Sequence, residues 1–191
     1  MAFTNETTGI THLKILYAGA TNAGKSKNIQ SIYQIIKAPF LSDQEKKASL
    51  CFLKNDLFEF LPLKYSFQNK QEVIIHLFTF PAHDSWETVN INLMQGIDGL
   101  IYVVDSRKSF FKSSERQIQR IERFLKIPFL RIDSIATVYQ LNYYDNPEAL
   151  PVQTLKSSLN ILDSNCICAN AASGLGVIET LEALINKIPF P

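Results

Sequence analysis

The sequence predicts an α/β fold in which a mostly parallel sheet carries helices on both faces. Short apolar runs rich in β-forming residues alternate along the chain with segments of helical periodicity, which is typical of parallel strands joined by crossover helices. The 191 residues, 46% hydrophobic and 19% charged, are enough for one buried core and too few for two ordinary domains. We therefore expect a single domain over residues 1–191.

The first half of the chain contains three apolar runs and one helical pattern. Leu13–Ala18 ends in a glycine-bearing turn and predicts a buried strand, and Val73–Phe80 predicts another. Gly99–Val104 has no polar alternation, as expected of a strand covered on both faces of a parallel sheet. A helix is predicted after the first turn, with apolar positions at Ile29, Ile32, Tyr33 and Ile36. The least regular stretch is Ala38–Asn69, within which we expect a mobile loop.

The second half continues the alternation. Ser114 followed by Gln117 has the spacing of a capping box and predicts the start of a helix. The apolar positions of that helix are Ile118, Ile121, Phe124 and Leu125. A strand, a helix, a strand and a closing helix are predicted at Ile135–Leu141, Leu150–Leu159, Cys166–Ala169 and Val177–Ile188.

Composition limits the compartment and the classes of partner. Lys+Arg 19 against Asp+Glu 18 gives a formal net charge of +1, which provides no global attraction for nucleic acid or an anionic membrane. Cys51, Cys166 and Cys168 cannot form a disulfide framework, and we interpret the Cys-x-Cys pair as two buried thiols at the end of a strand. No signal peptide, lipidation motif or apolar run of about 20 residues is present, so we expect a cytoplasmic protein without lipid anchor or transmembrane segment.

A local excess of positive charge lies between Arg107 and Lys126. This stretch contains seven lysines and arginines against only Glu115 and Glu122. We interpret it as a solvated helix face, and a docking surface for an acidic partner is the alternative.

A complete phosphate-binding motif lies between the first strand and the first helix. The stretch from Gly19 to Ser26 matches G-x-x-x-x-G-K-[ST], with an apolar run before it and an amphipathic segment after it. The glycines let successive N–H groups point at a phosphate, Lys25 reaches the β- and γ-phosphates, and the Ser26 hydroxyl can ligate Mg²⁺. We predict that this segment binds nucleotide through Gly19, Ala20, Thr21, Asn22, Ala23, Gly24, Lys25, Ser26 and Lys27.

A second motif concerns the base. Asn142-Tyr143-Tyr144-Asp145 follows a predicted strand, where regulatory GTPases have Asn-Lys-x-Asp. The aspartate of that motif accepts two hydrogen bonds from guanine, and adenine offers no such pair of donors. Asn142 and Asp145 match, while Tyr143 replaces the lysine and could stack its ring on the base. The alternative is an ordinary polar loop before Pro147.

Over its whole length the chain resembles the Ras-like small GTPases, and most closely the MglA type of bacterial gliding motility. Besides the phosphate loop, the likeness rests on Phe60-Leu61-Pro62-Leu63, His76-Leu77-Phe78-Thr79-Phe80-Pro81, Gly96-Ile97-Asp98-Gly99, Val104-Asp105-Ser106 and Ser173-Gly174-Leu175-Gly176. It implies the three-layer P-loop NTPase fold of small GTPases, with a mostly parallel sheet of six strands. It further implies binding of GTP or GDP with Mg²⁺ and a ribose-side motif at Ala171, Ala172 and Ser173. It also implies a role in cell polarity or in motility by gliding or type IV pili, with a Roadblock/LC7-type regulator and downstream effectors.

The sequence departs from this family in both switch regions. Lys54 and Asn55 fall where relatives have a catalytic arginine and a threonine that binds Mg²⁺. Ala82 and His83 replace the glycine and the water-positioning glutamine of the second switch. The resemblance makes His83 and Lys54 candidate catalytic residues, and Ser26 and Asn55 candidate metal ligands.

These departures leave more than one function open. The leading interpretation is a guanine-nucleotide switch with slow hydrolysis. The alternative is a pseudo-GTPase that acts as an interaction scaffold with little or no hydrolysis. A small-molecule P-loop kinase is a weaker third interpretation, because it would make the guanine-type motif a coincidence.

Overall fold

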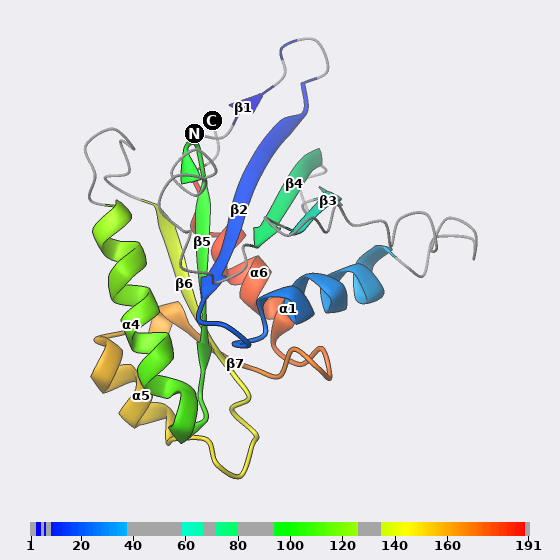
Figure 1. The fold of residues 1–191 in the computed structure, drawn as a ribbon. Helices are drawn as coiled ribbons and strands as arrows, with labels where there is room; N and C mark the ends of the chain where they lie inside the picture. Colours follow the sequence, from blue (N-terminus) through cyan, green and yellow to red (C-terminus); the bar gives the residue numbers. More distant parts are fainter. Residues whose placement is uncertain are drawn as a thin grey trace.

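The computed structural model describes residues 3–4, 6, 9–37, 59–66, 72–79, 94–125 and 135–189. Within them the sheet has the strand order β3-β4-β2-β5-β6-β7 (Figure 1). The six strands are β2 (Thr11–Gly19), β3 (Glu59–Ser66), β4 (Glu72–Thr79), β5 (Gly99–Asp105), β6 (Ala136–Asn142) and β7 (Cys166–Ala169). Only β3 runs antiparallel along this path, and a two-residue strand, β1 (Phe3–Thr4), pairs antiparallel with β2. The predicted fold class is therefore confirmed, with β1 as an addition to the six expected strands.

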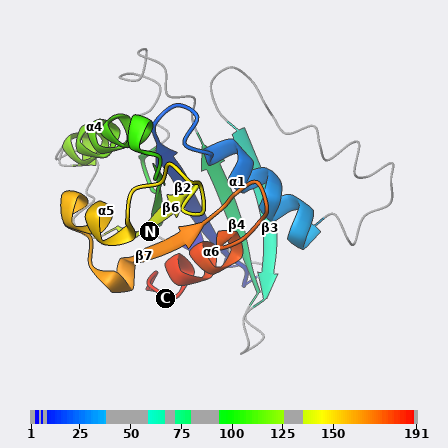
Figure 2. The ribbon, with the colours of Figure 1, turned by 90° about the horizontal axis from the view of Figure 1, so that it is seen from below.

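Helices cover both faces of the sheet. The helices are α1 (Lys25–Ile32), which continues as a π-helical turn (Tyr33–Lys37), α4 (Lys108–Leu125), α5 (Val152–Leu159) and α6 (Val177–Ile185). Helices α1 and α6 lie on one face, and α4 and α5 lie on the other (Figures 1 and 2). A short 3₁₀ turn (Asp163–Asn165) leads into β7.

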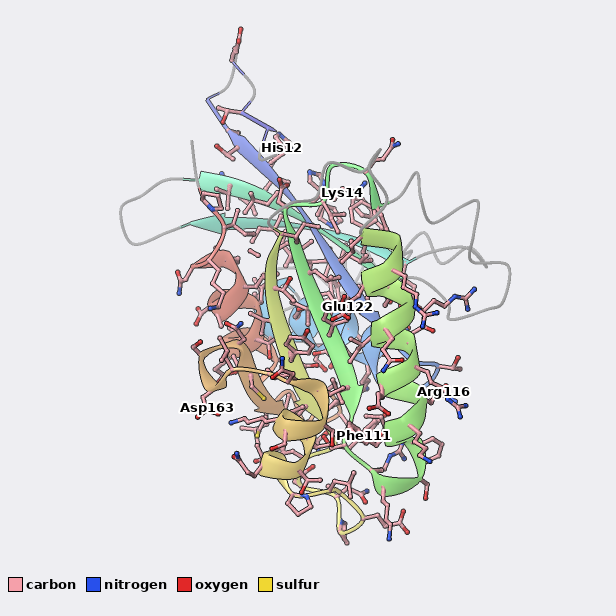
Figure 3. All side chains as sticks on the ribbon, turned by 90° about the vertical axis from the view of Figure 1, so that its left-hand side faces the viewer. His12, Lys14, Phe111, Arg116, Glu122 and Asp163 are labelled. Atoms are coloured by element: carbon pink, nitrogen blue, oxygen red, sulfur yellow. The ribbon has the colours of Figure 1, made fainter. Side chains whose placement is uncertain are left out.

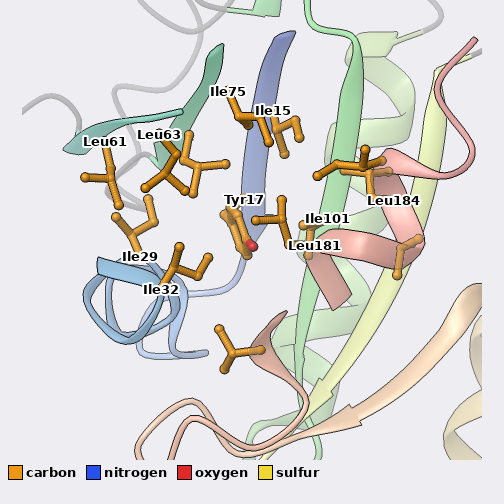
Figure 4. Close-up of a cluster of buried hydrophobic side chains, with 14 of the residues drawn as sticks. Ile15, Tyr17, Ile29, Ile32, Leu61, Leu63, Ile75, Ile101, Leu181 and Leu184 are labelled. Carbon is orange, nitrogen blue, oxygen red and sulfur yellow. The ribbon is translucent and has the colours of Figure 1, made fainter. Parts of the chain in front are cut away.

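The central strands are apolar on both sides because each face carries its own core. Ile15 and Tyr17 point from β2 toward α1 and α6, where they pack with Ile29 and Ile32 (Figure 4). Leu13 of the same strand belongs to this cluster. The alternate β2 residues Leu16 and Ala18 belong to the second cluster, under α4 and α5. Every residue of β5 is buried. This explains why the strand predicted at Gly99–Val104 shows no polar alternation.

Strand β3 lies inside the least regular stretch, Ala38–Asn69, where the hydrophobic pattern predicted no strand. Pro62 and the charged residues around it conceal the strand, because proline cannot donate to a ladder and argues against a central position. β3 is the edge strand, and Pro62 is exposed on it. Residues 38–58 and 67–69 of the same stretch lie outside the described residues.

Helix α4 begins at Lys108, six residues before the predicted start, so the prediction that Ser114 opens a capping box is wrong. Ser114 is buried within the helix, and its hydroxyl accepts a hydrogen bond of 2.9 Å from the Asp105 N–H. The residue joins α4 to the end of β5 instead of capping a helix. On the same helix Phe111 and Glu122 point toward the sheet and Arg116 points away (Figure 3), as a solvated basic face requires.

The Cys-x-Cys pair is less buried than expected. Cys166 and Cys168 are free thiols and are only half-buried, because they lie on the edge strand β7. Burial raises the pKa of the Cys166 thiol to about 11, which keeps it protonated at neutral pH. Among the described helices, none combines the length and the apolar character needed to cross a lipid bilayer.

Two histidines meet side by side on β2 and β4. The Nδ1 atom of His12 and the Nε2 atom of His76 are 2.9 Å apart, and the ring centroids are 5.3 Å apart. On its other neighbouring strand, His76 stacks on Phe60 at 5.7 Å. One of the two nitrogens must be unprotonated to accept the hydrogen bond, and two imidazolium ions at this distance would repel each other. Burial and the neighbouring His12 lower the pKa of His76.

We expect acid to weaken the fold through this pair. The unfolded chain, with a histidine pKa of about 6.5, takes up its proton at a higher pH than the folded chain does. The contribution of the histidine pair to the free energy of unfolding is fully present above the pKa of the unfolded chain and is lost as the pH falls below that pKa. Urea denaturation between about pH 7.5 and pH 5.5 should show a shallower loss of unfolding free energy for His76→Phe than for the wild type. Equal slopes would contradict this prediction.

Candidate nucleotide-binding site

The loops after β2, β6 and β7 come together at one end of the molecule (Figures 1 and 2). The carboxyl ends of parallel strands meet along the same edge of a sheet, where α/β proteins place ligands. The loop after β2 leads into α1, and the loops after β6 and β7 pass beside it (Figure 2).

Gly24 allows the phosphate loop to approach its neighbour. Its φ of 102° is unfavourable for any residue with a side chain, and a Cβ there would overlap the amide nitrogen of Asn142. Helix α1 then begins at Lys25 without a side-chain cap. The first-turn N–H groups thus point from an uncapped helix N-terminus, which favours an anion.

Lys25 is held in place by the loop that it serves. Its ammonium donates to the carbonyl oxygens of Gly19 at 3.1 Å and Ala20 at 2.8 Å. The residue is only 7% exposed, and this burial lowers its pKa to about 8, although the Glu59 carboxylate opposes the shift. A desolvated ammonium of this kind gains from any anion that enters the loop.

Asn142 joins the phosphate loop to the loop after β7. Its Nδ2 donates to the Ala23 carbonyl at 2.7 Å, and its Oδ1 accepts from the Ala171 N–H at 2.8 Å. Its own carbonyl accepts from the Ser106 N–H at 3.0 Å. The side chain is fully buried. One residue of β6 therefore fixes three segments that are distant in sequence.

A second buried amide lies two residues earlier on β6. Gln140 exchanges two hydrogen bonds with Asn28 of α1, at 2.7 and 2.8 Å, and also donates to the Thr180 hydroxyl of α6 at 3.1 Å. Thr180 in turn donates to the carbonyl of Gly176. These contacts orient α1 and α6 against the same strand.

The remaining residues of the guanine-type motif take two different roles. The backbone of Tyr143 is left-handed, with φ of 59°, and its hydroxyl donates to the Asn22 carbonyl at 3.3 Å. Both carboxylate oxygens of Asp145 accept from the Asn170 side-chain amide, at 3.0 and 2.8 Å. Asp145 is exposed, so its remaining lone pairs face solvent.

A cavity of about 520 Å³ brings much of the predicted site together. It is lined by Asn22, Gly24, Lys25, Ser26, Lys27, Arg107, Phe110 and Tyr143. Asp145 and the segment 171–173 do not line it. Asn170 connects Asp145 to this segment, and Asn142 connects the segment to the phosphate loop. Of that segment, Ala171 is buried, while Ala172 and Ser173 are exposed.

Three candidate residues, Lys54, Asn55 and His83, lie outside the described residues, as does the departure at Ala82. Conversely, sequence reasoning missed Arg107, Phe110 and Asn170 as site residues. The sequence indicated Arg107 only as part of a basic stretch. Its position directly after Asp105 and Ser106, at the end of a strand, is the signal that could have identified it as a site residue. Nothing local distinguishes Asn170, because its partner lies 25 residues away.

The chain was compared with known proteins. No family model matches it. It is 28% identical over 193 residues to the mutual gliding-motility protein MglA of Myxococcus xanthus, covering 98% of this chain and 96% of that protein. It is 26% identical over 133 residues to elongation factor 4 of Sorangium cellulosum and 25% identical over 133 residues to that of Bacillus subtilis. Those matches cover 68% of this chain and only 20% of each elongation factor.

We expect removal of the Asn142 side chain to destabilise the protein even without nucleotide. Asn142→Ala leaves the buried Ala171 N–H and Ala23 carbonyl without their partner, which should lower the free energy of unfolding by about 1–3 kcal/mol. Urea denaturation would measure it. The matched control is Asn146→Ala, which removes an exposed hydrogen bond to the Glu148 N–H and should change stability by less than about 0.5 kcal/mol. Equal losses for the two variants would contradict the bridging role.

Proposed function

We propose that the chain, a distant homologue of MglA and of the translational GTPases with a P-loop GTPase fold, is a guanine-nucleotide switch of the small-GTPase type. The observation that carries the proposal is the Asn142 bridge, which fixes the phosphate loop and the loop after β7 on either side of the guanine-type motif. A phosphate loop alone would fit many nucleotides. Its rigid connection to Asp145 and Tyr143 favours one that carries guanine.

In this proposal three groups of residues bind different parts of the nucleotide. The N–H groups at the start of α1 and the Lys25 ammonium take the phosphates. The Ser26 hydroxyl, in the lining of the same cavity, would hold Mg²⁺ together with phosphate oxygens of the nucleotide. When bound, that ion neutralises charge on the phosphates. Asp145 would accept two hydrogen bonds from the guanine edge, with the segment 171–173 beside the ribose.

The finer role follows from the likeness to MglA, which covers nearly the whole of both chains. We propose that the protein acts in cell polarity or surface motility and responds to a Roadblock/LC7-type regulator. Lys54 and His83 are the proposed catalytic residues, and Asn55 is a proposed second metal ligand. Since all three depart from the family pattern, we expect unaided hydrolysis to be slow: an arginine finger alone is worth about 10³–10⁵ in rate.

The same departures favour a second function, a pseudo-GTPase scaffold that binds nucleotide without turning it over. GTP turnover with Mg²⁺, measured alone and with a candidate regulator, separates the two. Hydrolysis that the regulator accelerates supports the switch. Bound GTP that stays intact in both conditions supports the scaffold.

We expect guanine nucleotides to bind more than about 100-fold tighter than adenine nucleotides, because guanine offers Asp145 two hydrogen-bond donors and adenine offers no such pair. Asp145→Asn should reduce this preference. Calorimetry with GDP and ADP in the presence of Mg²⁺ would measure it. Asp163→Asn is the matched control, because Asp163 is an exposed carboxylate that pairs with Lys156 on the surface. Equal affinities of the wild type for GDP and ADP would refute the guanine assignment.

The affinity for GDP should fall as pH rises above about 8. Burial lowers the pKa of Lys25 to about 8 in the nucleotide-free protein, and a bound phosphate would raise it again. Above the lower value, binding must therefore take up a proton. Calorimetry near pH 9 in buffers of different ionisation enthalpy would detect this uptake. Lys25→Arg stays charged and should show none. Proton uptake that is the same in both proteins would contradict the assignment to Lys25.

A further inference from the structure

We propose that Arg107 is a positioning residue of the base site, which holds the Tyr143 ring as the platform on which the base stacks. The inference rests on the proposed guanine-nucleotide binding and deepens it. Its geometric basis is a cluster of three side chains at the rim of the cavity. The guanidinium carbon of Arg107 lies over the Tyr143 ring, 4.2 Å from its centroid, and 4.4 Å from the centroid of Phe110.

Arg107 itself is fixed by a buried carboxylate. Its Nη2 and Nε donate to the two oxygens of Asp105, at 2.6 and 3.0 Å, and its backbone N–H donates to Asp105 at 3.1 Å. Asp105 is 1% exposed at the end of β5. A two-point contact of this kind fixes the plane of the guanidinium as well as its position. The cation over Tyr143 is therefore anchored to the central sheet.

Tyr143 is in turn held at two points. Its hydroxyl is tied to the Asn22 carbonyl of the phosphate loop, and Arg107 covers one face of its ring. A ring has two faces, so a base that stacks on Tyr143 must use the face opposite Arg107. The lysine expected at this place would offer a flexible stem. A tyrosine needs a support of this kind to present its face in one orientation.

A direct role at the phosphates is the competing explanation, because Arg107 lines the same cavity as Lys25 and Ser26. Two features argue against it. The Nε and Nη2 donors are already used by Asp105, whose charge offsets that of the guanidinium. The two ring contacts also restrain the side chain from swinging toward the phosphate loop.

The test is a double-mutant cycle on base stacking, with GDP, IDP and inorganic pyrophosphate as probes and calorimetry or competition as the measurement. IDP keeps the ring face of GDP and lacks its exocyclic amine. Arg107→Ala should weaken GDP and IDP by the same factor, about three- to fivefold, and leave pyrophosphate unchanged. In a Tyr143→Ala background, Arg107→Ala should cause no further loss, because its effect passes through that ring. Lys108→Ala, which removes the neighbouring exposed charge, is the matched control and should change none of the three affinities.

Three results would overturn the inference. An Arg107→Ala effect that persists in the Tyr143→Ala background, or that extends to pyrophosphate, would assign Arg107 to the phosphates. An unchanged GDP affinity in Arg107→Ala would remove its role while leaving the proposed function intact. A wild-type protein that binds no GDP would overturn both. Arg107→Gln, which retains a hydrogen-bond donor for Asp105, serves as the second variant if Arg107→Ala does not fold, with the same expected losses.

Discussion

The site depends on a constraint at the end of β6, where a buried side-chain amide has to satisfy polar groups from two other loops. Asn142 meets the Ala23 carbonyl on one side and the Ala171 N–H on the other, and none of these groups can turn to water. An unpaired buried polar group is costly, so the three segments hold one relative arrangement. This arrangement also restricts position 24 to glycine, because the Asn142 side chain fills the space that a Cβ would need.

This constraint extends from the loops into the helices. Gln140, two residues before Asn142 on the same strand, pairs with Asn28 of α1 and with Thr180 of α6. A shift of the phosphate loop would therefore have to carry α1 with it or break buried hydrogen bonds. The same rigidity explains why Lys25 is desolvated, because its ammonium group is held by carbonyl oxygens of the phosphate loop. The loop holds a cation that is poorly solvated before any anion arrives, which is the kind of preorganisation that favours phosphate binding.

The parts of the structure that depend on neighbours in sequence could be predicted, and those that depend on distant partners could not. The phosphate loop and the strand β5 are visible locally, because one needs glycines at fixed positions and the other is apolar on both faces. Strand β3 was hidden by Pro62, which is tolerated only because the strand lies at the edge. The start of α4 was misplaced because Ser114 looks like a cap, whereas its hydroxyl serves a backbone N–H of β5. Asn170 matters through its contact with Asp145, 25 residues away, and no local pattern indicates such a pair. Arg107 follows the end of β5 directly, but its contact with Tyr143 could not be read from the sequence.

The substitution of tyrosine for lysine in that motif is best understood as one part of a connected change. Tyr143 reaches the phosphate loop with its hydroxyl and rests under a guanidinium that Asp105 anchors, so the base side of the site remains internally consistent. The departures at Lys54, Asn55, Ala82 and His83 belong to the switch segments, which act on the γ-phosphate in the family that the chain resembles. In the proposed function, binding and hydrolysis would therefore draw on different residues and could change independently. A chain of this kind would keep the recognition of guanine while a partner controls its rate of turnover.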